Sequence, residues 1–522
     1  MKKYLFLAVA ALGLAACAEK GLDNNGPANK GELEQSYVAI TLAADDMNTK
    51  AADGQYVEGL PAERKVESAY VFFFKDGDAF PVSFDGTTST NGGLINYLPV
   101  TLADNGKDMN NVSDVKEAVL ILQNYQGQYP NQIVAVLNWT PTNNKLYTLS
   151  DIQKEITALR GYKNGFVMSN AVYADKAAET VDAVDLTIAN IGKTAQEALD
   201  NPVTIHVERV AAKVAFSSEN SGMFEVGEVD GKKIYAQIKG FQLYNDYQTS
   251  WLIKRITPTW DDLGFIWNDP SWFRSYWATS LDTAFPENYF EWEGGYTELD
   301  SFVYCGENTR TWTEENDVRT KVIVKAALVN ADGTVRQEVV NWYGKDYLGE
   351  GNLLKVVANT LKNTYFSGDG STFTGLAPED IMCVGRNMTD ENAYEVYFQL
   401  SETGAAKTWY KYADNNYGEI ATATLNTELA AVQPALVYND GMTYYYTDIK
   451  HLGAPKSTAE YGVVRNHVYN VNITGITGFG TPVYDSTTDF IVPDKPEEIK
   501  TYVSAQINIL SWRVVDHDYN LN

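Results

Sequence analysis

Apolar residues occupy every second position in many short runs along the chain, and glycine, asparagine and aspartate separate these runs. In the first run, residues 36–42, the side chains of Val38, Ile40 and Leu42 share one face of a predicted strand. In the second half of the run 64–77 both faces are apolar, which predicts a strand in the centre of a sheet. Similar runs follow at 132–139, 206–216, 234–244, 321–329, 394–400 and 468–476. The pattern predicts a mainly β protein built from β-sandwiches, with a few short helices.

The last apolar run differs from the others because it follows a linker, residues 481–500, that contains three prolines. X-Pro steps favour extended backbone, so we expect this linker to lead away from the body of the protein. The tail beyond it alternates cleanly and then changes phase by one residue at Ile509-Leu510, which indicates a bulge or kink. The apolar positions of the tail are Val503, Ala505, Ile507, Ile509, Leu510, Trp512 and Val514.

Two interpretations of this tail remain open. It folds back onto its own sandwich as a final strand, or it fills a groove in another chain. The tail and the first run share a Tyr-Val start and the same apolar alternation, so both could occupy one groove. If Val38, Ile40 and Leu42 were removed, the tail of a neighbouring copy could replace them as a donor strand.

Two capping boxes and one tight turn stand out between the runs. Ser150 with Gln153, and Thr194 with Glu197, have the capping-box spacing, and each pair predicts a short helix. The first helix is expected to extend to Leu159. An Asn-Asp-Gly sequence at 439–441 lies between aromatic runs and predicts the type I′ turn of a β-hairpin over 435–446.

The first 17 residues have the order of a secretory signal: two lysines, a short apolar run, and small residues before Cys17. The apolar run is too short to cross a bilayer of about 30 Å as a helix. Residues 14–17 resemble the bacterial lipobox, which implies cleavage before Cys17 and lipidation of that cysteine. The alternative is an ordinary signal peptide with an incidental cysteine.

A polar loop after the first apolar run ends at Lys50, and such a loop is open to a trypsin-like protease. Cutting there would make Ala51 the new N-terminus and would separate the first strand from the chain. Arg64 is a possible second processing site. With a length of 522 residues, two or three domains are expected. The predicted division is 1–17 signal peptide, 18–50 tether and removable strand, 51–225 N-terminal sandwich, 226–480 C-terminal sandwich, and 481–522 linker and donor strand.

Composition narrows the possible functions. The formal charge is −27 with the acidic excess spread along the chain, which disfavours nucleic-acid and anionic-membrane binding. Besides Cys17, the chain has only Cys305 and Cys383, which are expected to be isolated buried thiols, and its four histidines are scattered. No Ser-His-Asp order, HExxH sequence, phosphate-binding loop or Cys/His cluster is present, so we expect no enzyme, no metal and no cofactor.

One aromatic cluster suggests a different kind of site. Trp267, Trp272, Tyr276 and Trp277 fall within eleven residues, and clustered aromatic rings can stack on sugars. The alternative is core or interface packing. A fimbrial tip adhesin or a glycan-binding surface lipoprotein is therefore the second functional hypothesis.

Several segments together resemble a known family. They are the lipobox at Cys17, the basic loop before 51–54, 65–74, 134–138, 207–209, 212–214, 307–309, 464–469 and the ending 509–514. In this order they resemble the shaft subunits of type V fimbriae of the Bacteroidales, in particular the short-fimbria (Mfa-type) major subunit family. Lys50 stands where members of that family often have an arginine, which leaves the processing protease open.

The resemblance implies two transthyretin-like β-sandwich domains and a structural role in cell-surface fimbriae that support adhesion and biofilm formation. It implies export as a lipoprotein precursor held at the outer membrane, removal of the N-terminal strand at Lys50–Ala51, and polymerisation by C-terminal strand donation. The implied partners are other copies of the chain, anchor and tip subunits, the processing protease, and a host or bacterial surface ligand.

Overall fold

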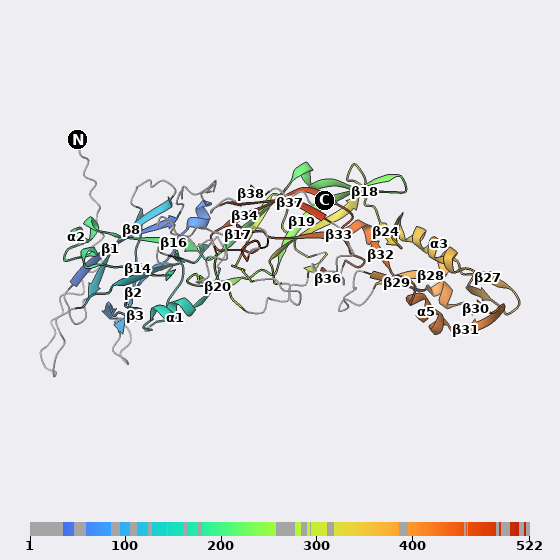
Figure 1. Ribbon diagram of the computed structural model, residues 1–522, viewed down its shortest axis with the longest axis horizontal. Coiled ribbons are helices and arrows are strands. Elements are labelled where there is room, and N and C mark those ends of the chain that lie inside the picture. The colour runs from blue at the N-terminus through green and yellow to red at the C-terminus, as the bar shows by residue number, and fades with distance from the viewer. Residues whose placement is uncertain are drawn as a thin grey trace.

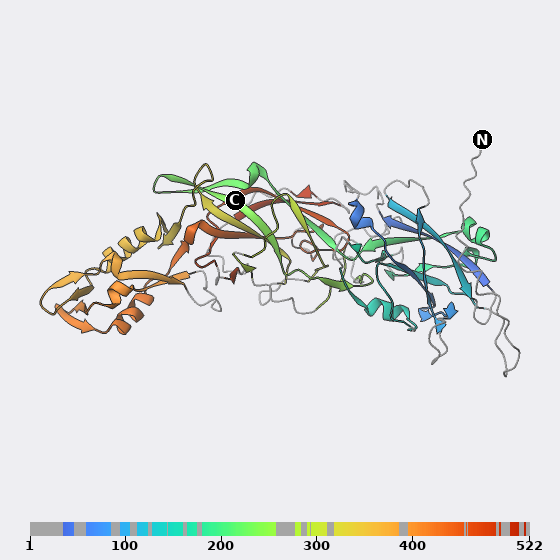
Figure 2. The same ribbon diagram turned by 180° about the vertical axis from the view of Figure 1, so that it is seen from behind.

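The structure is a computed structural model that describes residues 35–45, 59–84, 94–104, 112–123, 128–143, 145–159, 164–174, 180–256, 277–282, 290–292, 294–310, 318–385, 395–453, 456, 458–486, 490–491, 502–510 and 516–517. This part of the chain is elongated and consists of three units in a row (Figure 1). An N-terminal unit lies at one end, a sandwich lies in the middle, and a distal unit lies at the other end; the view from behind shows the same order (Figure 2). The mainly β fold with sandwich packing is confirmed.

The N-terminal unit is one large sheet that surrounds a core. The strands of its main path, in spatial order, are β3 (Asp78–Ala79), β2 (Ala69–Lys75), β9 (Gln132–Leu137), β11 (Met168–Asn170), β16 (Val203–Arg209), β1 (Gln35–Asp45), β8 (Val112–Gln123) and β7 (Ala103–Asp104). The short strands β6 (Tyr97–Pro99), β14 (Val184–Asp185) and β15 (Ile191–Gly192) pair at its side.

Strand β2 is buried on both faces, as its apolar run predicts. Val71 and Phe73 face the core that β1 and β16 also line, and Phe72 and Phe74 face a second cluster below helix α1 (Leu149–Lys154). The Phe72 ring packs edge-on against Tyr147, with 5.5 Å between the ring centroids. The strand therefore separates two apolar layers, which requires both of its faces to be apolar.

The middle unit is a sandwich of two five-stranded sheets. One sheet contains β22 (Ser301–Cys305), β17 (Ala212–Ser218), β34 (Val468–Thr477), β37 (Tyr502–Leu510) and β38 (Asp516–His517). The facing sheet contains β18 (Met223–Val229), β19 (Lys232–Tyr244), β23 (Lys321–Val329), β33 (Met442–Asp448) and β35 (Thr481–Pro482). Alternate residues of β17, β34, β19 and β23 meet in one core, which explains the period-2 pattern of β17, β34 and β19.

The distal unit is inserted between β23 and β33, which are neighbouring strands of the middle sandwich. It has its own core and three helices, α3 (Glu350–Leu361), α4 (Glu402–Ala405) and α5 (Thr422–Ala430). Its sheets consist of β25 (Lys345–Leu348), β24 (Val339–Trp342), β32 (Ala435–Tyr438), β29 (Glu395–Leu400) and β28 (Ile381–Gly385), and of β27 (Phe373–Gly375), β26 (Tyr365–Gly368), β30 (Trp409–Ala413) and β31 (Asn416–Ile420). The expected division, with one C-terminal sandwich over 226–480, does not separate this distal unit from the middle sandwich. The chain also leaves the N-terminal sheet before the expected boundary at 225/226, at Val210-Ala211.

The local signals predicted from the sequence have different outcomes. Helix α2 (Ala195–Asp200) begins as predicted, because the Thr194 hydroxyl accepts a hydrogen bond from the Glu197 backbone N–H at 3.2 Å. Helix α1 is capped two residues earlier than predicted, by Thr148 instead of Ser150. It ends at Lys154, and the chain then turns into strand β10 (Ile156–Ala158).

The predicted hairpin over 435–446 is wrong. Its two halves are β32 and β33, which belong to different sheets. Asp440 does adopt the positive φ, 48°, that a tight turn requires, but the turn leads the chain out of the distal unit instead of closing a hairpin. In the part of the chain that the structure describes, no helix is long and apolar enough to span a membrane.

Candidate functional site

Strand β1, which carries Val38, Ile40 and Leu42, lies inside the N-terminal sheet. It runs parallel to β16 on one side and antiparallel to β8 on the other, so that Ile40 is opposite both Val203 and Ala118. The side chains of Val38 and Ile40 are completely buried in the core, while the side chain of Leu42 lies outside what the structure describes. Removing β1 would therefore leave two strand edges and part of the core without cover.

Strand β37, which carries the first part of the predicted donor strand, pairs antiparallel with β34 of its own chain. The register places Ala505, Ile507 and Ile509 opposite Ile473, Val471 and Tyr469, which are all core residues of the middle sandwich. In this structure the tail therefore adopts the first of the two interpretations, a final strand on its own sandwich. The apolar phase of the tail matches the inward phase of β34, so folding back lets it cover the edge of that core.

The position of β37 in its sheet is close to the edge. Among the described strands of this sheet, the one beyond it is β38, which is two residues long. Strands β1 and β37 therefore occupy different sheets and different positions, one central and one near an edge. Val503 is opposite Ile476 and Leu510 is opposite Val468, while Trp512 and Val514 fall outside the described residues.

Where the chain crosses from the N-terminal sheet into the middle sandwich, buried polar residues from both units meet. The backbone N–H of Asn466 donates to the Ala211 carbonyl at 2.8 Å, and the N–H of Lys213 donates to the His467 carbonyl at 3.0 Å. We call this region the junction. Its side chains are Glu63, Glu208, Arg209, Lys213, Lys254, Tyr304, Glu307, Arg465 and Asn466.

Glu63 is the centre of one half of the junction. It lies in the short helix η1 (Pro61–Arg64) and is fully buried. Its carboxylate accepts hydrogen bonds from Lys213 Nζ at 2.8 Å and from the Tyr304 hydroxyl. Its backbone carbonyl accepts from Arg209 Nε at 2.8 Å, and Arg209 Nη1 donates to Asn466 Oδ1 at 3.1 Å. Glu63 thus joins the end of β16 to strands β17 and β22.

The other half of the junction contains four buried charges. Lys254 Nζ is 2.7 Å from Glu208 Oε2, and Arg465 Nη2 is 3.4 Å from Glu307 Oε1. All four side chains are at least 98% buried. Two carboxylates and two cations balance each other, as buried charges require.

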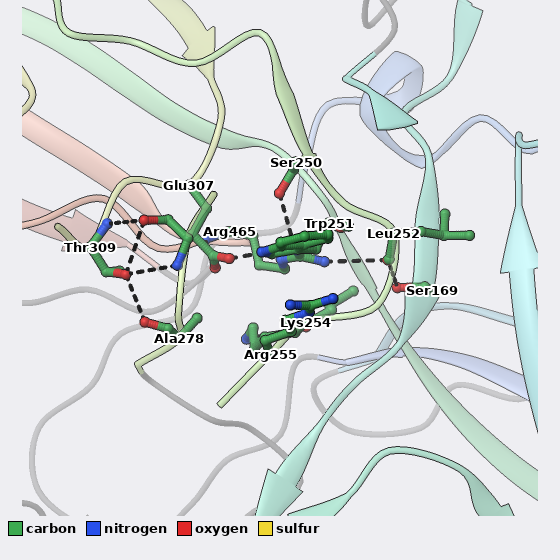
Figure 3. Close-up of polar contacts among 12 residues, drawn as sticks. Ser169, Ser250, Trp251, Leu252, Lys254, Arg255, Ala278, Glu307, Thr309 and Arg465 are labelled. Carbon is green, nitrogen blue, oxygen red and sulfur yellow. Dashed lines mark hydrogen bonds and ion pairs between the residues drawn. The ribbon is translucent and has the colours of Figure 1, made fainter. Parts of the chain in front are cut away.

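Arg465 makes further contacts in this half, and Figure 3 shows it between Glu307 and the strand that ends at Trp251. Its Nη2 donates to Ser250 Oγ at 2.9 Å and to the Trp251 carbonyl at 2.8 Å. Its Nη1 donates to the Leu252 carbonyl at 3.4 Å. The same carbonyl accepts from Ser169 Oγ at 2.6 Å, so it joins Arg465 to strand β11 of the N-terminal unit.

The two halves are coupled through neighbouring residues. Glu208 and Arg209 are consecutive in β16, and their side chains enter different halves because successive side chains of a strand point to opposite sides. Arg465 and Asn466 are consecutive in the turn before β34, and their side chains also enter different halves. Both halves are therefore held by the same two backbone segments, which fixes the N-terminal unit against the middle sandwich.

Burial perturbs the ionisation of this half. Burial raises the pKa of the Glu208 carboxyl, and Lys254 and Arg465 oppose the rise. Burial also lowers the pKa of the Lys254 ammonium, and Glu208 and Glu307 oppose that shift. In both groups burial is the largest cause of the pKa shift, and the ion pairs of the junction offset only a part of it.

The other predicted site residues have separate outcomes. Cys17, Lys50, Ala51, Trp267, Trp272 and Tyr276 lie outside the described residues. Trp277 is 3% exposed, and its ring packs 5.6 Å from the ring of His451. The buried position of Trp277 agrees with the alternative of core packing for this residue.

Trp277 also packs against backbone: a Cβ added to Gly462 would lie 3.0 Å from the indole. We expect Trp277→Phe to lower the free energy of unfolding by about 1–2 kcal/mol through lost packing. Chemical denaturation would measure this loss. A variant with unchanged stability and impaired glycan binding would contradict the core assignment.

Cys305 and Cys383 are both buried free thiols, as predicted. Burial raises the pKa of each thiol, which keeps it protonated and unreactive. Among the described residues no group of three or more His, Cys, Asp or Glu side chains is placed to hold a metal ion.

Sequence reasoning missed the junction as a site. The segments 207–209, 212–214, 307–309 and 464–469 carry the family resemblance as separate pieces, and the structure shows that they meet at the junction. Charged residues inside apolar runs, such as Glu208-Arg209, were the signal that could have indicated it.

Residues 436–518 match the family model described as "Major fimbrial subunit protein type IV, Fimbrillin, C-terminal". The matched segment includes β33, β34 and β37. The match confirms the resemblance to fimbrial subunits for this part of the chain, which is similar to the C-terminal region of the fimbrillin family.

Three solved structures are similar to the chain at low sequence identity. A fimbrilin from Porphyromonas gingivalis is 12% identical, with 92% of this chain and 98% of that chain covered and a TM-score of 0.36. A candidate cell adhesion protein from Parabacteroides distasonis is 13% identical, with 91% of this chain and 96% of that chain covered and a TM-score of 0.36. A candidate cell adhesion protein from Bacteroides eggerthii is 10% identical, with 93% of this chain and 98% of that chain covered and a TM-score of 0.36. No curated protein sequence matches the chain.

Proposed function

We propose that the chain is a precursor of a fimbrial shaft subunit that is exported as a lipoprotein through Cys17, processed at Lys50–Ala51, and polymerised by strand donation between copies. The fimbrillin match over 436–518 supports the subunit class. The place of action is the fimbrium on the cell surface, with the lipidated precursor held at the outer membrane. The partners are other copies of the chain, anchor and tip subunits, and the processing protease.

The observation that carries strand donation is the central position of β1. This strand belongs to the segment that processing would separate from the chain, yet its Val38 and Ile40 are fully buried between β8 and β16. Burial of these two side chains contributes about 1.5–3 kcal/mol each, so the vacated slot would strongly favour a replacement strand. Loss of β1 therefore creates a binding site for an apolar strand.

The tail has the properties that such a replacement needs. β37 spans nine residues and β1 spans eleven, and both are apolar at alternate positions. β37 lies near the edge of its own sheet, so its release breaks the pairing with β34 but leaves β22, β17 and β34 paired with one another. Because the slot and the tail are different surfaces, each copy can give one strand and accept one, and the assembly grows as a filament.

The processing step is testable at the cell surface. N-terminal sequencing of the surface form is expected to begin at Ala51. Lys50→Ala should leave the precursor unprocessed and unpolymerised, because a trypsin-like protease needs a basic residue before the cleaved bond. Lys50→Arg keeps that charge and serves as the matched control. Fibres of normal length from Lys50→Ala would contradict processing at this bond.

A further inference from the structure

The peptide bond after Arg64 is held in a compact turn on its N-terminal side. Within η1 the Glu63 backbone N–H donates to the Leu60 carbonyl at 2.8 Å, and the Lys65 N–H donates to the Ala62 carbonyl at 3.4 Å. The Leu60 N–H donates to Glu63 Oε2 at 2.7 Å, which closes the turn through the side chain. Proteases act on exposed, locally open segments, and this turn is neither extended nor free to open.

The Glu63 side chain anchors the turn to the middle sandwich. Its carboxylate is paired with Lys213 Nζ, and this contact is almost fully buried on the Glu63 side. Lys213 Nζ also lies 3.9 Å from the centre of the Phe302 ring, so the ammonium is held in a fixed place between carboxylate and ring. Moving η1 away would leave the ammonium of Lys213 and the hydroxyl of Tyr304 without this acceptor.

The C-terminal side of the same bond is held by Asn138. This residue is 1% exposed and has the positive φ of 58° that asparagine tolerates. Its Nδ2 donates to the Lys65 carbonyl at 2.8 Å, and its Oδ1 accepts from the Glu67 N–H at 2.7 Å and from the Ser68 N–H at 3.3 Å. Asn138 thus fixes the chain directly after the Arg64–Lys65 bond.

We propose that Glu63 closes the chain to proteolysis after Arg64, and that the mature subunit keeps η1 as a part of the junction. This rests on the proposed processing of the precursor by a trypsin-like protease. A cut after Arg64 would release Glu63 with the N-terminal segment, and the junction would lose the residue that joins β16 to β17 and β22. Productive processing is therefore confined to bonds before Leu60.

Limited digestion of the purified full-length precursor with trypsin tests this directly. Mass spectrometry would follow the appearance of new N-termini at Lys65 and Val66, which report cutting after the two neighbouring basic residues. In the wild type these termini should appear only when the protein unfolds. Glu63→Ala should make them appear at least about tenfold faster, because local opening no longer breaks the buried contacts.

Glu67→Ala is the matched control. Glu67 is also a glutamate close to the bond, but its contact with Lys65 is exposed, with 39% of the Glu67 side chain accessible. Its replacement should leave the rate unchanged. Asn138→Ala acts from the other side of the bond and should accelerate cutting as well, which gives a second variant if Glu63→Ala does not fold.

Two results would overturn the proposal. One is cutting after Arg64 in the folded wild type at the rate seen for Glu63→Ala. The other is a folded Glu63→Ala, or a folded Asn138→Ala, with the wild-type rate. The trypsin assay does not depend on fimbria formation: an unprocessed surface form would refute the proposed function alone, whereas a surface form that begins at Lys65 would refute this inference and leave processing intact.

Discussion

A disulfide between β34 and β37 is expected to hold the subunit as a monomer, and its reduction is expected to release the subunit for assembly. Asn470 and Asn508 are directly opposite each other in the antiparallel pair. Opposite residues have Cα atoms about 4.5–5.5 Å apart, which suits a disulfide. The double variant Asn470→Cys/Asn508→Cys should therefore cross-link within one chain. Electron microscopy should show fibres from the processed, reduced protein and none from the oxidised protein.

A second cross-link controls for the effect of a disulfide as such. Ala413 and Asn416 are an exposed pair in the hairpin between β30 and β31 of the distal unit, away from both β1 and β37. Oxidised Ala413→Cys/Asn416→Cys should polymerise normally. Normal fibres from the oxidised β34–β37 variant would show that the tail stays in its own chain during assembly, and strand donation by β37 would be refuted.

This test is sharper than removal of the tail. Deleting residues 501–522 also prevents donation, but it uncovers the edge of β34 and the core residues Tyr469, Val471 and Ile473 beside it. A truncated chain could then fail to assemble because it misfolds or aggregates through the open edge. The cross-link keeps that edge covered, so it separates loss of donation from loss of fold.

The strands of the three cores were the most predictable part of the fold. In β17 and β34 the alternation of apolar and polar residues indicates which face meets the core, and this information is local. The same holds for the Thr194 cap, whose hydrogen bond spans three residues. Such features depend on neighbours in the sequence, so a single sequence contains them.

The positions of strands relative to one another were less predictable. The alternation of apolar and polar residues in β37 is compatible both with a slot like that of β1 and with the edge of β34. The alternation alone does not determine which of the two positions the strand occupies. The Asn-Asp-Gly turn has the local chemistry of a hairpin. In the fold, however, residues 330–441, which are 112 residues, lie between β23 and β33, and the turn returns the chain from the inserted distal unit to β33. Long-range pairing decides both cases.

The junction was the least predictable part of the candidate site. Glu63 is 146 residues from Arg209 and 241 residues from Tyr304 in the sequence. Each residue looks like an ordinary charged or polar side chain in its own segment. Only the meeting of β16, β17 and β34 turns them into a buried network, and burial then makes each charge depend on its partners.

Replacing Arg465 is expected to be the most destabilising single change in the junction. Arg465→Met leaves Glu307 buried without its cation, and it removes the donor that joins Ser250 and the Trp251 carbonyl. Breaking a buried ion pair by removing one partner costs about 3–5 kcal/mol in the free energy of unfolding. Denaturant unfolding would measure the loss, and hydrogen exchange should show that protection falls first where β11 and β20 (Thr249–Trp251) meet the junction.

Two further variants decide whether the loss comes from the buried pair. Arg336→Met removes the same side chain from an exposed pair with Asp440, and this pair should contribute less than about 1 kcal/mol. Combining Arg465→Met with Glu307→Gln removes the uncompensated carboxylate, so the double variant should be more stable than the sum of the two single losses predicts. Two results would show that the ion pair does not hold the two units together. One is a stability loss in the double variant that equals the sum of the two single losses. The other is an Arg465→Met variant that is as stable as Arg336→Met, because removing one partner of a coupled buried pair must destabilise the fold more than removing one partner of an exposed pair.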